Sequence, residues 1–187
     1  PDASGNYPNN PNYAGNPLFV RDKARNDDDN NRFIQSLKLT TKIIDSGKDR
    51  VRMVWSGGLD FLANETYVYV PEIHQAQNGG DNGFIGVGKN NFKNYNLLGL
   101  GVWNRDALNG DLALTTQAGV SYLKRDADVV FNQATQLIPG QTTLGRGSAQ
   151  AISQTQSEIE EFGHFGQIEG NYKDQIIATF GYRPDKS

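Results

Sequence analysis

The sequence predicts an all-β fold, a six-strand segment of a larger antiparallel transmembrane β-barrel. The first observation is that stretches of about ten residues alternate between apolar and polar side chains, as strands between lipid and water do. The second is that the connections between these stretches alternate between short and long, which is typical of such barrels. We therefore expect three hairpins within residues 32–187.

The composition of residues 1–31 predicts a long extracellular loop. Four prolines stand among asparagines and glycines there, and an Asp/Asn run over residues 27–31 follows them. Such a composition is typical of a solvated, irregular segment.

The candidate strands show period-two alternation, whereas a helix would need apolar residues at three- and four-residue spacing. In residues 50–62, Val51 and Trp55 lie on one face, and Arg52 lies on the other. In residues 95–103, the alternation places Leu98 and Val102 on the apolar face. The six candidate strands are residues 32–43, 50–62, 95–103, 112–123, 162–172 and 175–183, of which residues 162–172 alternate least clearly.

The connections carry further information. Tight turns are expected at residues 45–49, at residues 106–111 and at residues 173–174, the second of which contains the turn dipeptide Asn109-Gly110. Long polar loops are expected at residues 63–94 and 124–161. Loops of that length are uncommon in compact soluble domains, so this rhythm favours the barrel.

Aromatic residues in or at the ends of the strands fit the girdles that such barrels place at the membrane surface. The alternative is that they are ordinary core residues of a soluble β-domain. These aromatics are Trp55, Trp103, Tyr122, Tyr172, Phe180 and Tyr182.

Composition and charge exclude several other classes of protein. The net charge is -3, and no lysine or arginine stripe marks a nucleic-acid track, so no nucleic-acid partner is expected. The chain has 0 cysteines, which excludes disulfides and thiolate metal sites. No apolar run approaches the roughly 20 residues that a spanning helix needs, so a membrane role must depend on strands.

Catalytic and metal-binding patterns are not evident. The two histidines, His74 and His164, are far apart in the sequence, and the acidic run at residues 27–29 lacks the alternation and the glycine of a calcium loop. The sequence therefore predicts no enzyme, no catalytic residue, no metal and no cofactor.

Substrate contacts are expected in the long loops, where aromatic rings could stack on a sugar or pack on a peptide. The candidate substrate-binding residues are Tyr67, Tyr69, His74 and Phe131. The alternative for each is packing within the loops themselves.

Three short motifs follow one another along the chain. Residues 16–37 contain Asn-Pro-Leu-Phe, the Asp/Asn-rich run and then Asn-Arg-Phe, residues 57–61 are Gly-Gly-Leu-Asp-Phe, and residues 171–187 form the third motif. In their order and spacing these motifs resemble SusC/RagA-type TonB-dependent transporters, in which they correspond to the lead into one barrel strand, the following strand and a later hairpin. Gln175 and Lys186 depart from the pattern, where the family often has Arg and Gly.

This resemblance implies a piece of a roughly 22-stranded, plugged barrel in the bacterial outer membrane. It also implies import of a bulky nutrient, a glycan or an oligopeptide, with energy supplied through TonB. The implied partners are the rest of the barrel with its plug, a SusD-like surface lipoprotein, TonB, the substrate and outer-membrane lipid. A secreted, soluble all-β carbohydrate-binding module is the alternative, and a structural barrel without transport is a third reading.

Overall fold

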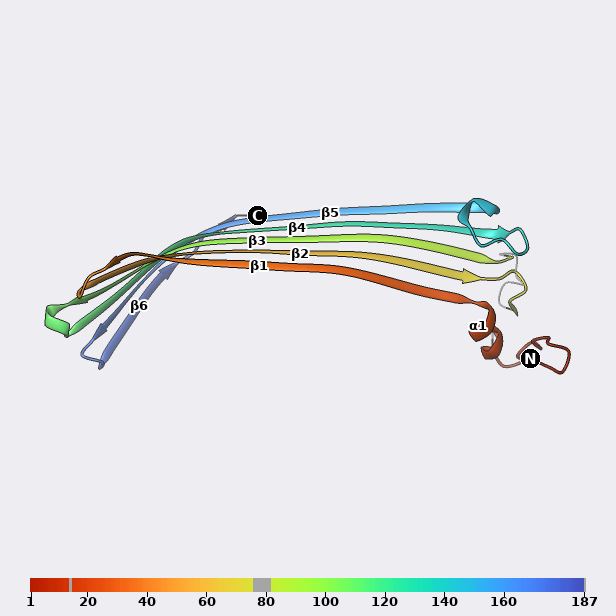
Figure 1. Ribbon diagram of the computed structural model, residues 1–187, viewed down its shortest axis with the longest axis horizontal. Coiled ribbons are helices and arrows are strands. Elements are labelled where there is room, and N and C mark those ends of the chain that lie inside the picture. The colour runs from red at the N-terminus through yellow and green to blue at the C-terminus, as the bar shows by residue number, and fades with distance from the viewer. Residues whose placement is uncertain (14, 76–81, 187) are drawn as a thin grey trace. The chain divides into compact units, whose positions relative to one another are not determined.

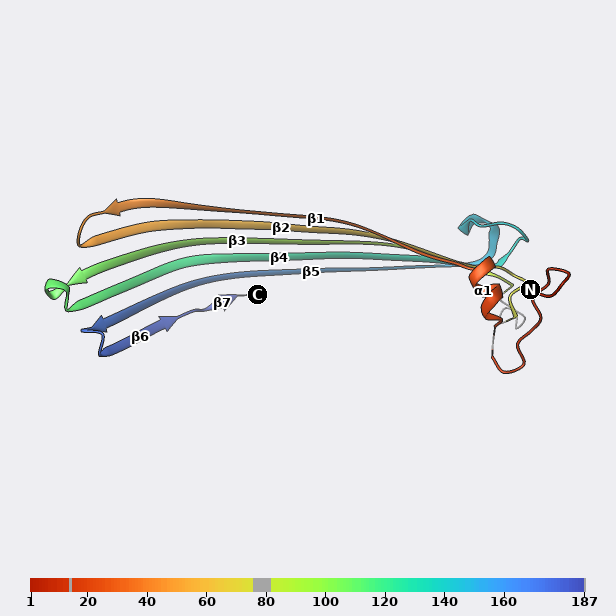
Figure 2. The same ribbon diagram turned by 60° about the horizontal axis from the view of Figure 1, so that its bottom comes forward.

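The computed structural model describes residues 1–13, 15–75 and 82–186, and it is almost entirely β-structure. The strands belong to one sheet in the order β1-β2-β3-β4-β5-β6, and β7 pairs with β5. In both ribbon views the neighbouring strands lie side by side in this order (Figures 1 and 2). The elements are α1 (Pro17–Lys23), β1 (Arg25–Asp45), β2 (Asp49–Val70), β3 (Phe84–Ala107), η2 (Leu108–Gly110), β4 (Leu112–Leu137), η3 (Leu144–Arg146), β5 (Gly147–Tyr172), β6 (Ile176–Tyr182) and β7 (Asp185–Lys186).

The all-β prediction is confirmed, and the six antiparallel strands are consistent with a segment of a barrel. The strands are longer than the sequence indicated. Residues 63–70 continue β2, and residues 84–94 belong to β3, so the expected loop at 63–94 is wrong over most of its length. Part of that loop, residues 76–81, lies outside the described residues.

The loop expected at residues 124–161 is also wrong, because β4 continues to Leu137 and β5 begins at Gly147. The segment of residues 1–31 likewise contains α1 and the start of β1. These stretches lack a clear alternation of apolar and polar residues, the pattern by which a strand is recognised; residues 153–158, for example, are polar on both faces. Their backbone can still pair in a ladder, since pairing needs only N–H and C=O groups.

The tight turns lie where the sequence places them. In the first, the backbone N–H of Ser46 donates to the carbonyl oxygen of Asp49 at 2.9 Å. In the second, Asn109 and Gly110 have φ angles of 57° and 100°. In the third, Lys173 and Asp174 have φ angles of 53° and 55°, and Tyr172 pairs with Ile176, so residues 173–175 connect β5 and β6.

Residue contacts divide the chain into two compact units. Unit 1 comprises residues 1–32, 62–91 and 127–156, and unit 2 comprises residues 33–61, 92–126 and 157–187. Unit 1 contains a buried apolar cluster of Tyr69, Ile85, Ala134 and Leu137. In unit 2, Val102 is the buried hydrophobic residue of the described chain.

Glycine contacts show which side chains share a face in unit 2. A Cβ atom on Gly99 would lie 2.8 Å from the Trp55 ring, and one on Gly57 would lie 3.0 Å from the Leu97 side chain. A Cβ on Gly58 would instead meet the side chain of Asn96. Trp55 and Leu97 therefore share one face, and their alternating neighbours occupy the other.

This arrangement corrects one assignment from the sequence. Leu98 and Val102 lie on the face opposite Trp55, not with it, because they alternate with Leu97 and Gly99. Gly99 and Gly101 lie on the Trp55 side of β3, so this face looked less apolar in the sequence than the opposite one. In the structure the Trp55 ring occupies the space above Gly99.

Candidate functional site

One face of unit 2 is largely apolar, and we call this surface the apolar band. It includes the alternate residues of the stretches 33–43, 51–61, 95–103, 112–122, 162–170 and 176–182. Neutral Gln35, Thr41 and Thr116 interrupt it together with His164, and no Lys, Arg, Asp or Glu occupies these positions. Five of the six stretches have about nine to eleven residues, the length with which a tilted strand crosses a membrane.

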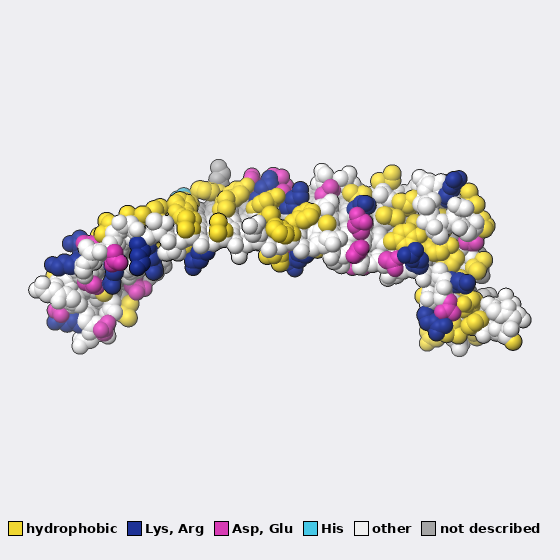
Figure 3. Space-filling model, viewed as in Figure 1, with side chains coloured by type: hydrophobic (Ala, Val, Ile, Leu, Met, Phe, Trp, Pro, Cys, Tyr) yellow, Lys and Arg dark blue, Asp and Glu magenta, His cyan; other side chains and the backbone are white. Residues whose placement is uncertain are grey.

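The side chains of the apolar band are exposed. Leu37 is 72% exposed, Phe180 is 74% exposed and Trp55 is 49% exposed. The space-filling view shows hydrophobic side chains at the surface over the strands (Figure 3). An exposed apolar surface of this extent marks an interaction with lipid or with another protein.

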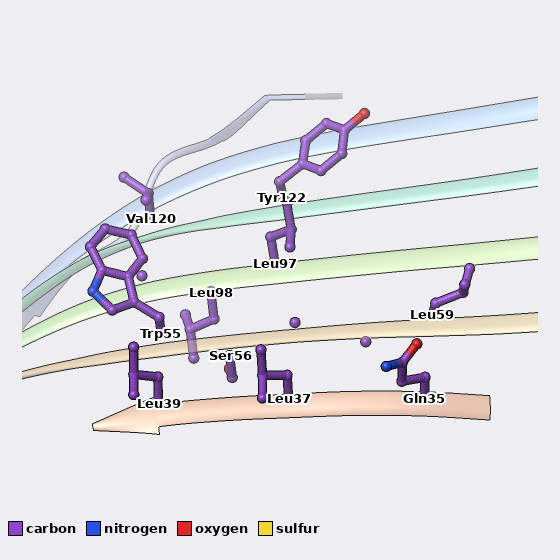
Figure 4. Close-up of a pocket in the computed structure, with 13 residues that line it drawn as sticks. Gln35, Leu37, Leu39, Trp55, Ser56, Leu59, Leu97, Leu98, Val120 and Tyr122 are labelled. Carbon is purple, nitrogen blue, oxygen red and sulfur yellow. The ribbon is translucent and has the colours of Figure 1, made fainter. Parts of the chain in front are cut away.

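A shallow groove of about 540 Å³ lies within the apolar band. Leu37 and Leu39 from β1, Trp55 from β2, and Val120 and Tyr122 from β4 line it (Figure 4). The groove exists because glycines leave the floor open, and the Trp55 ring covers Gly99. Its lining is suited to alkyl groups and offers almost no hydrogen-bond partner.

Amphipathic aromatic side chains lie at the ends of the stretches that form the band. The Trp103 indole N–H donates to a carboxylate oxygen of Asp49 at 2.9 Å, and the Arg105 guanidinium lies 5.9 Å from the Trp103 ring centroid. The Tyr122 hydroxyl donates to Glu160. A ring with one apolar and one polar side suits the boundary between lipid and water.

Unit 1 contains a connected group of polar side chains, which we call the amide network. Asn64 donates through its amide nitrogen to Asp28 and, at 3.0 Å, to Asn30, and its amide oxygen accepts from Asn90 at 2.7 Å. The Thr66 hydroxyl donates to Asp28 at 3.2 Å. The network thus joins neutral donors and acceptors from three adjacent strands, with one carboxylate.

Asp28 lies outside the stretches that form the apolar band, and its surroundings favour the ionised form. Hydrogen bonds from Asn64 and Asn30 hold the pKa of the Asp28 carboxyl below its usual value against the opposing effect of desolvation, and the Thr66 hydroxyl adds a smaller contribution in the same direction. The network therefore keeps one fixed negative charge at neutral pH.

Phe131 lies beside the amide network, on β4. Its ring is within 2.9 Å of the position that a Cβ atom of Gly86 would occupy and 3.6 Å from that of Gly88. The Thr66 side chain is 3.5 Å from the same Gly88 position, so the ring and the network are neighbours. Phe131 is 36% exposed, which leaves part of its ring open to a ligand.

The other three predicted substrate-binding residues are not gathered around Phe131. Tyr67 and Tyr69 lie on β2, in strand and not in a loop, and Tyr69 belongs to the buried cluster with Ile85. The Tyr67 hydroxyl donates to the carbonyl oxygen of Thr142 at 2.9 Å. Tyr67 and Tyr69 therefore contact other residues of this chain.

His74 is 8% exposed, and its ring centroid lies 5.2 Å from that of Phe19 in α1. A Cβ atom on Gly15 would lie 2.7 Å from its Nε2 atom. His74 therefore packs the N-terminal segment against residues 71–75.

Sequence reasoning missed the amide network, because it placed Asn64, Thr66 and Asn90 in a loop. The sequence did offer one signal, because Asn64 and Thr66 are two residues apart, which is the spacing of side chains on one face of a strand. In the described part of the chain, no three His, Cys, Asp or Glu residues gather in a way that could hold a metal ion. None of the helices described is long and apolar enough to cross a membrane.

Comparison with known proteins gives the fold and no closer relationship. No family model matches the chain, and no curated protein matches it. Among solved structures, the RagAB peptide transporter is similar, with a TM-score of 0.70 and 13% identity, over 91% of this chain. The RagAB peptide importer is similar in its open-open state (TM-score 0.66, 11% identity) and in its closed-closed state (TM-score 0.63, 12% identity). The chain spans 19% of the length of each of these structures.

Proposed function

We propose that this chain forms part of the wall of a TonB-dependent outer-membrane transporter that imports a bulky nutrient, an oligopeptide or a glycan. One observation carries the proposal. Six adjacent strands present an uncharged apolar face over about the thickness of a membrane, and the charged side chains of the same stretches lie on the opposite face. Such a two-sided wall would separate acyl chains from a water-filled passage.

Two further observations support the proposal. The fold is similar to that of RagAB peptide transporter structures, which favours an oligopeptide as the nutrient. The outer edge of β1 pairs with no strand among the described residues. Because an unpaired edge in lipid costs several kcal/mol for each backbone group, this edge would pair with another strand of a larger barrel.

The full transporter would require partners that the family resemblance suggests. These are the rest of the barrel with its plug, a SusD-like surface lipoprotein and TonB. The amide network, with the exposed ring of Phe131, would contact the nutrient, since it offers neutral hydrogen-bond donors and acceptors beside an apolar surface. Tyr67, Tyr69 and His74 remain predicted substrate contacts.

The alternative, a soluble carbohydrate-binding sandwich, requires two sheets packed face to face. All strands of the described residues belong to one sheet. The similar solved structures are of a peptide transporter, which favours a role other than catalysis.

Labelling of two adjacent residues tests the membrane assignment. In the full-length protein in lipid vesicles, a fluorophore on Leu37→Cys should be quenched by a nitroxide lipid and protected from aqueous iodide. The same fluorophore on Lys38→Cys, on the opposite face, should show the reverse pattern. Equal quenching of both sites by iodide would exclude a lipid-facing wall.

A transport assay tests the remaining part of the proposal. Cells that produce the full-length protein should accumulate a fluorescent oligopeptide, and a protonophore should abolish the accumulation. Phe131→Ala should lower uptake, whereas Ile152→Ala, an exposed apolar residue on β5, should not. Uptake that persists with the protonophore would contradict energy coupling through TonB.

A further inference from the structure

A second pocket lies in unit 2, near the turn between β1 and β2, and it is strongly basic. Its volume is about 380 Å³. The charged and amide side chains that line it are Lys42, Arg50, Arg52 and Asn104, and Asp45 is the one carboxylate among its lining residues. The whole chain has a net charge of -3, so this concentration of cations runs against its overall charge. We call this site the basic pocket.

The cations of the basic pocket are only partly neutralised by the protein. Arg50 lies 3.4 Å from a carboxylate oxygen of Asp106, and Lys42 lies 3.8 Å from Asp45 with its side chain 78% exposed. Arg52 forms no ion pair with any described residue. Like charges held on adjacent strands repel one another, so an anion in the pocket would lower the energy of the site.

Asn104 adds hydrogen-bond donors to the same pocket. Its amide oxygen accepts from the Thr115 hydroxyl at 3.1 Å, which fixes the amide group. The amide nitrogen has no acceptor among the described residues, so its donors are available to a ligand. Guanidinium, ammonium and amide donors together match the oxygens of a carboxylate.

We propose that the basic pocket binds carboxylate groups of an acidic oligopeptide on its way along the polar face. Arg50 and Arg52 are two residues apart on one strand, which separates their positions by about 6.8 Å. Carboxylates on alternate residues of an extended peptide have the same spacing. The pocket would therefore recognise an extended acidic chain better than a single compact anion. This inference rests on the proposed function and narrows its substrate class.

Peptide binding to the full-length protein tests the inference. The probes are the synthetic peptide Ala-Glu-Ala-Glu-Ala and its uncharged counterpart Ala-Gln-Ala-Gln-Ala, compared by isothermal titration calorimetry. The wild type should bind the acidic peptide on the order of tenfold more tightly, since each exposed ion pair contributes a few-fold. The difference should shrink as salt is raised, because screening weakens exposed pairs.

Two variants test whether the basic pocket causes the preference for the acidic peptide. Lys42→Gln combined with Arg52→Gln should bind both peptides with equal affinity. Arg125→Gln removes an exposed cation from another strand of unit 2, outside the pocket, and should keep the preference. Melting temperatures measured in parallel show whether any variant is misfolded.

Three results would overturn the inference. The first is equal affinity of the wild type for both peptides, and the second is a preference that survives in the double variant. The third is a double variant that melts at lower temperature and binds neither peptide, which would assign the cations to an acidic group of the protein itself. Failure of the Leu37 and Lys38 labelling would instead remove the proposed function, so the two failures are distinguishable.

Discussion

Units 1 and 2 share the same five long strands, yet they differ in how far their apolar side chains are buried. In unit 1, Tyr69, Ile85 and Leu137 gather in a small buried cluster, and Phe19 is buried against the N-terminal segment. In unit 2, Leu37, Trp55 and Phe180 are left at the surface. The same sheet thus makes its own apolar core in one unit and leaves its apolar face uncovered in the other.

The difference agrees with the proposed function, in which unit 1 lies in water and the apolar band of unit 2 lies against lipid. Water drives apolar side chains together, so a unit that faces water gains stability by gathering some of them in a core. A unit that faces acyl chains gains nothing from such burial, and its apolar side chains can point outward. The charges follow the same pattern. The positions of the apolar band are uncharged, whereas the surface of unit 1 is charged and rich in amides.

The largest expected effect comes from a charge in the apolar band. Leu37→Arg should destabilise the full-length protein in a bilayer by about 2–4 kcal/mol, the usual cost of arginine at the lipid-facing midplane of a barrel. Ile152→Arg in unit 1, at a residue that is 81% exposed, should change stability by less than about 0.5 kcal/mol. Urea titration of the protein in lipid vesicles measures both, and equal effects would remove the distinction between the units.

A cavity in unit 1 should have the next largest effect. Ile85 is 0% exposed within the buried cluster, so Ile85→Ala should lower the free energy of unfolding by about 2–3 kcal/mol. Ile168→Ala in the apolar band, at a residue that is 53% exposed, should cost less than half as much in detergent. Thermal melting in detergent tests this, and a larger loss for Ile168→Ala would show that unit 2 has a core of its own.

The glycine beneath Trp55 gives a smaller effect. A Cβ atom on Gly99 would lie 2.8 Å from the ring, so Gly99→Ala must displace Trp55, at a cost of about 1–2 kcal/mol. Gly47→Ala is the matched control, because nothing lies within 4 Å of its Cβ position. Tryptophan emission and melting should both shift for Gly99→Ala, and an unchanged spectrum would show that the ring does not rest on this glycine.

The same glycine shows how far the sequence predicts the fold. Alternation located all six strands, and the Asn109-Gly110 dipeptide located a turn, because both signals are local. The apolar face of β3 was misassigned, since a sequence does not show that a tryptophan from the neighbouring strand fills the space above Gly99. Which side chain crosses a strand is decided by register, which is a property of the sheet.

The candidate sites were predicted less well, for a related reason. Phe131 was named from the sequence, but Asn64 and Asn90 were taken as loop residues, although they contact one another across adjacent strands. Polar residues on both faces of a strand remove the pattern that identifies it. Arg52 was assigned to the polar face, yet the pocket that it forms with Arg50 and Asn104 depends on the pairing of β2 with β3.

The smallest expected effect is a loss of stability in unit 1 at low pH. This loss is expected because exposed polar contacts help to hold the N-terminal segment of that unit. Asp22 accepts from Arg21 at 2.6 Å and from the Tyr7 hydroxyl at 2.9 Å, and these hydrogen bonds lower the pKa of its carboxyl. A lowered pKa in the folded state means that the stabilisation is complete above the carboxyl's ordinary value of 3.8 and is lost as pH falls through the folded value.

Hydrogen exchange of residues 1–24, corrected for the intrinsic effect of pH, measures this loss. Protection of the wild type should decrease only under strongly acidic conditions, below the ordinary carboxyl value. Asp22→Asn should already be less protected at neutral pH, because a neutral amide accepts more weakly from Arg21 and Tyr7. Equal protection of the two proteins at neutral pH would show that the N-terminal segment is held by Phe19 and His74 alone, and therefore by the same kind of burial as the cluster around Ile85.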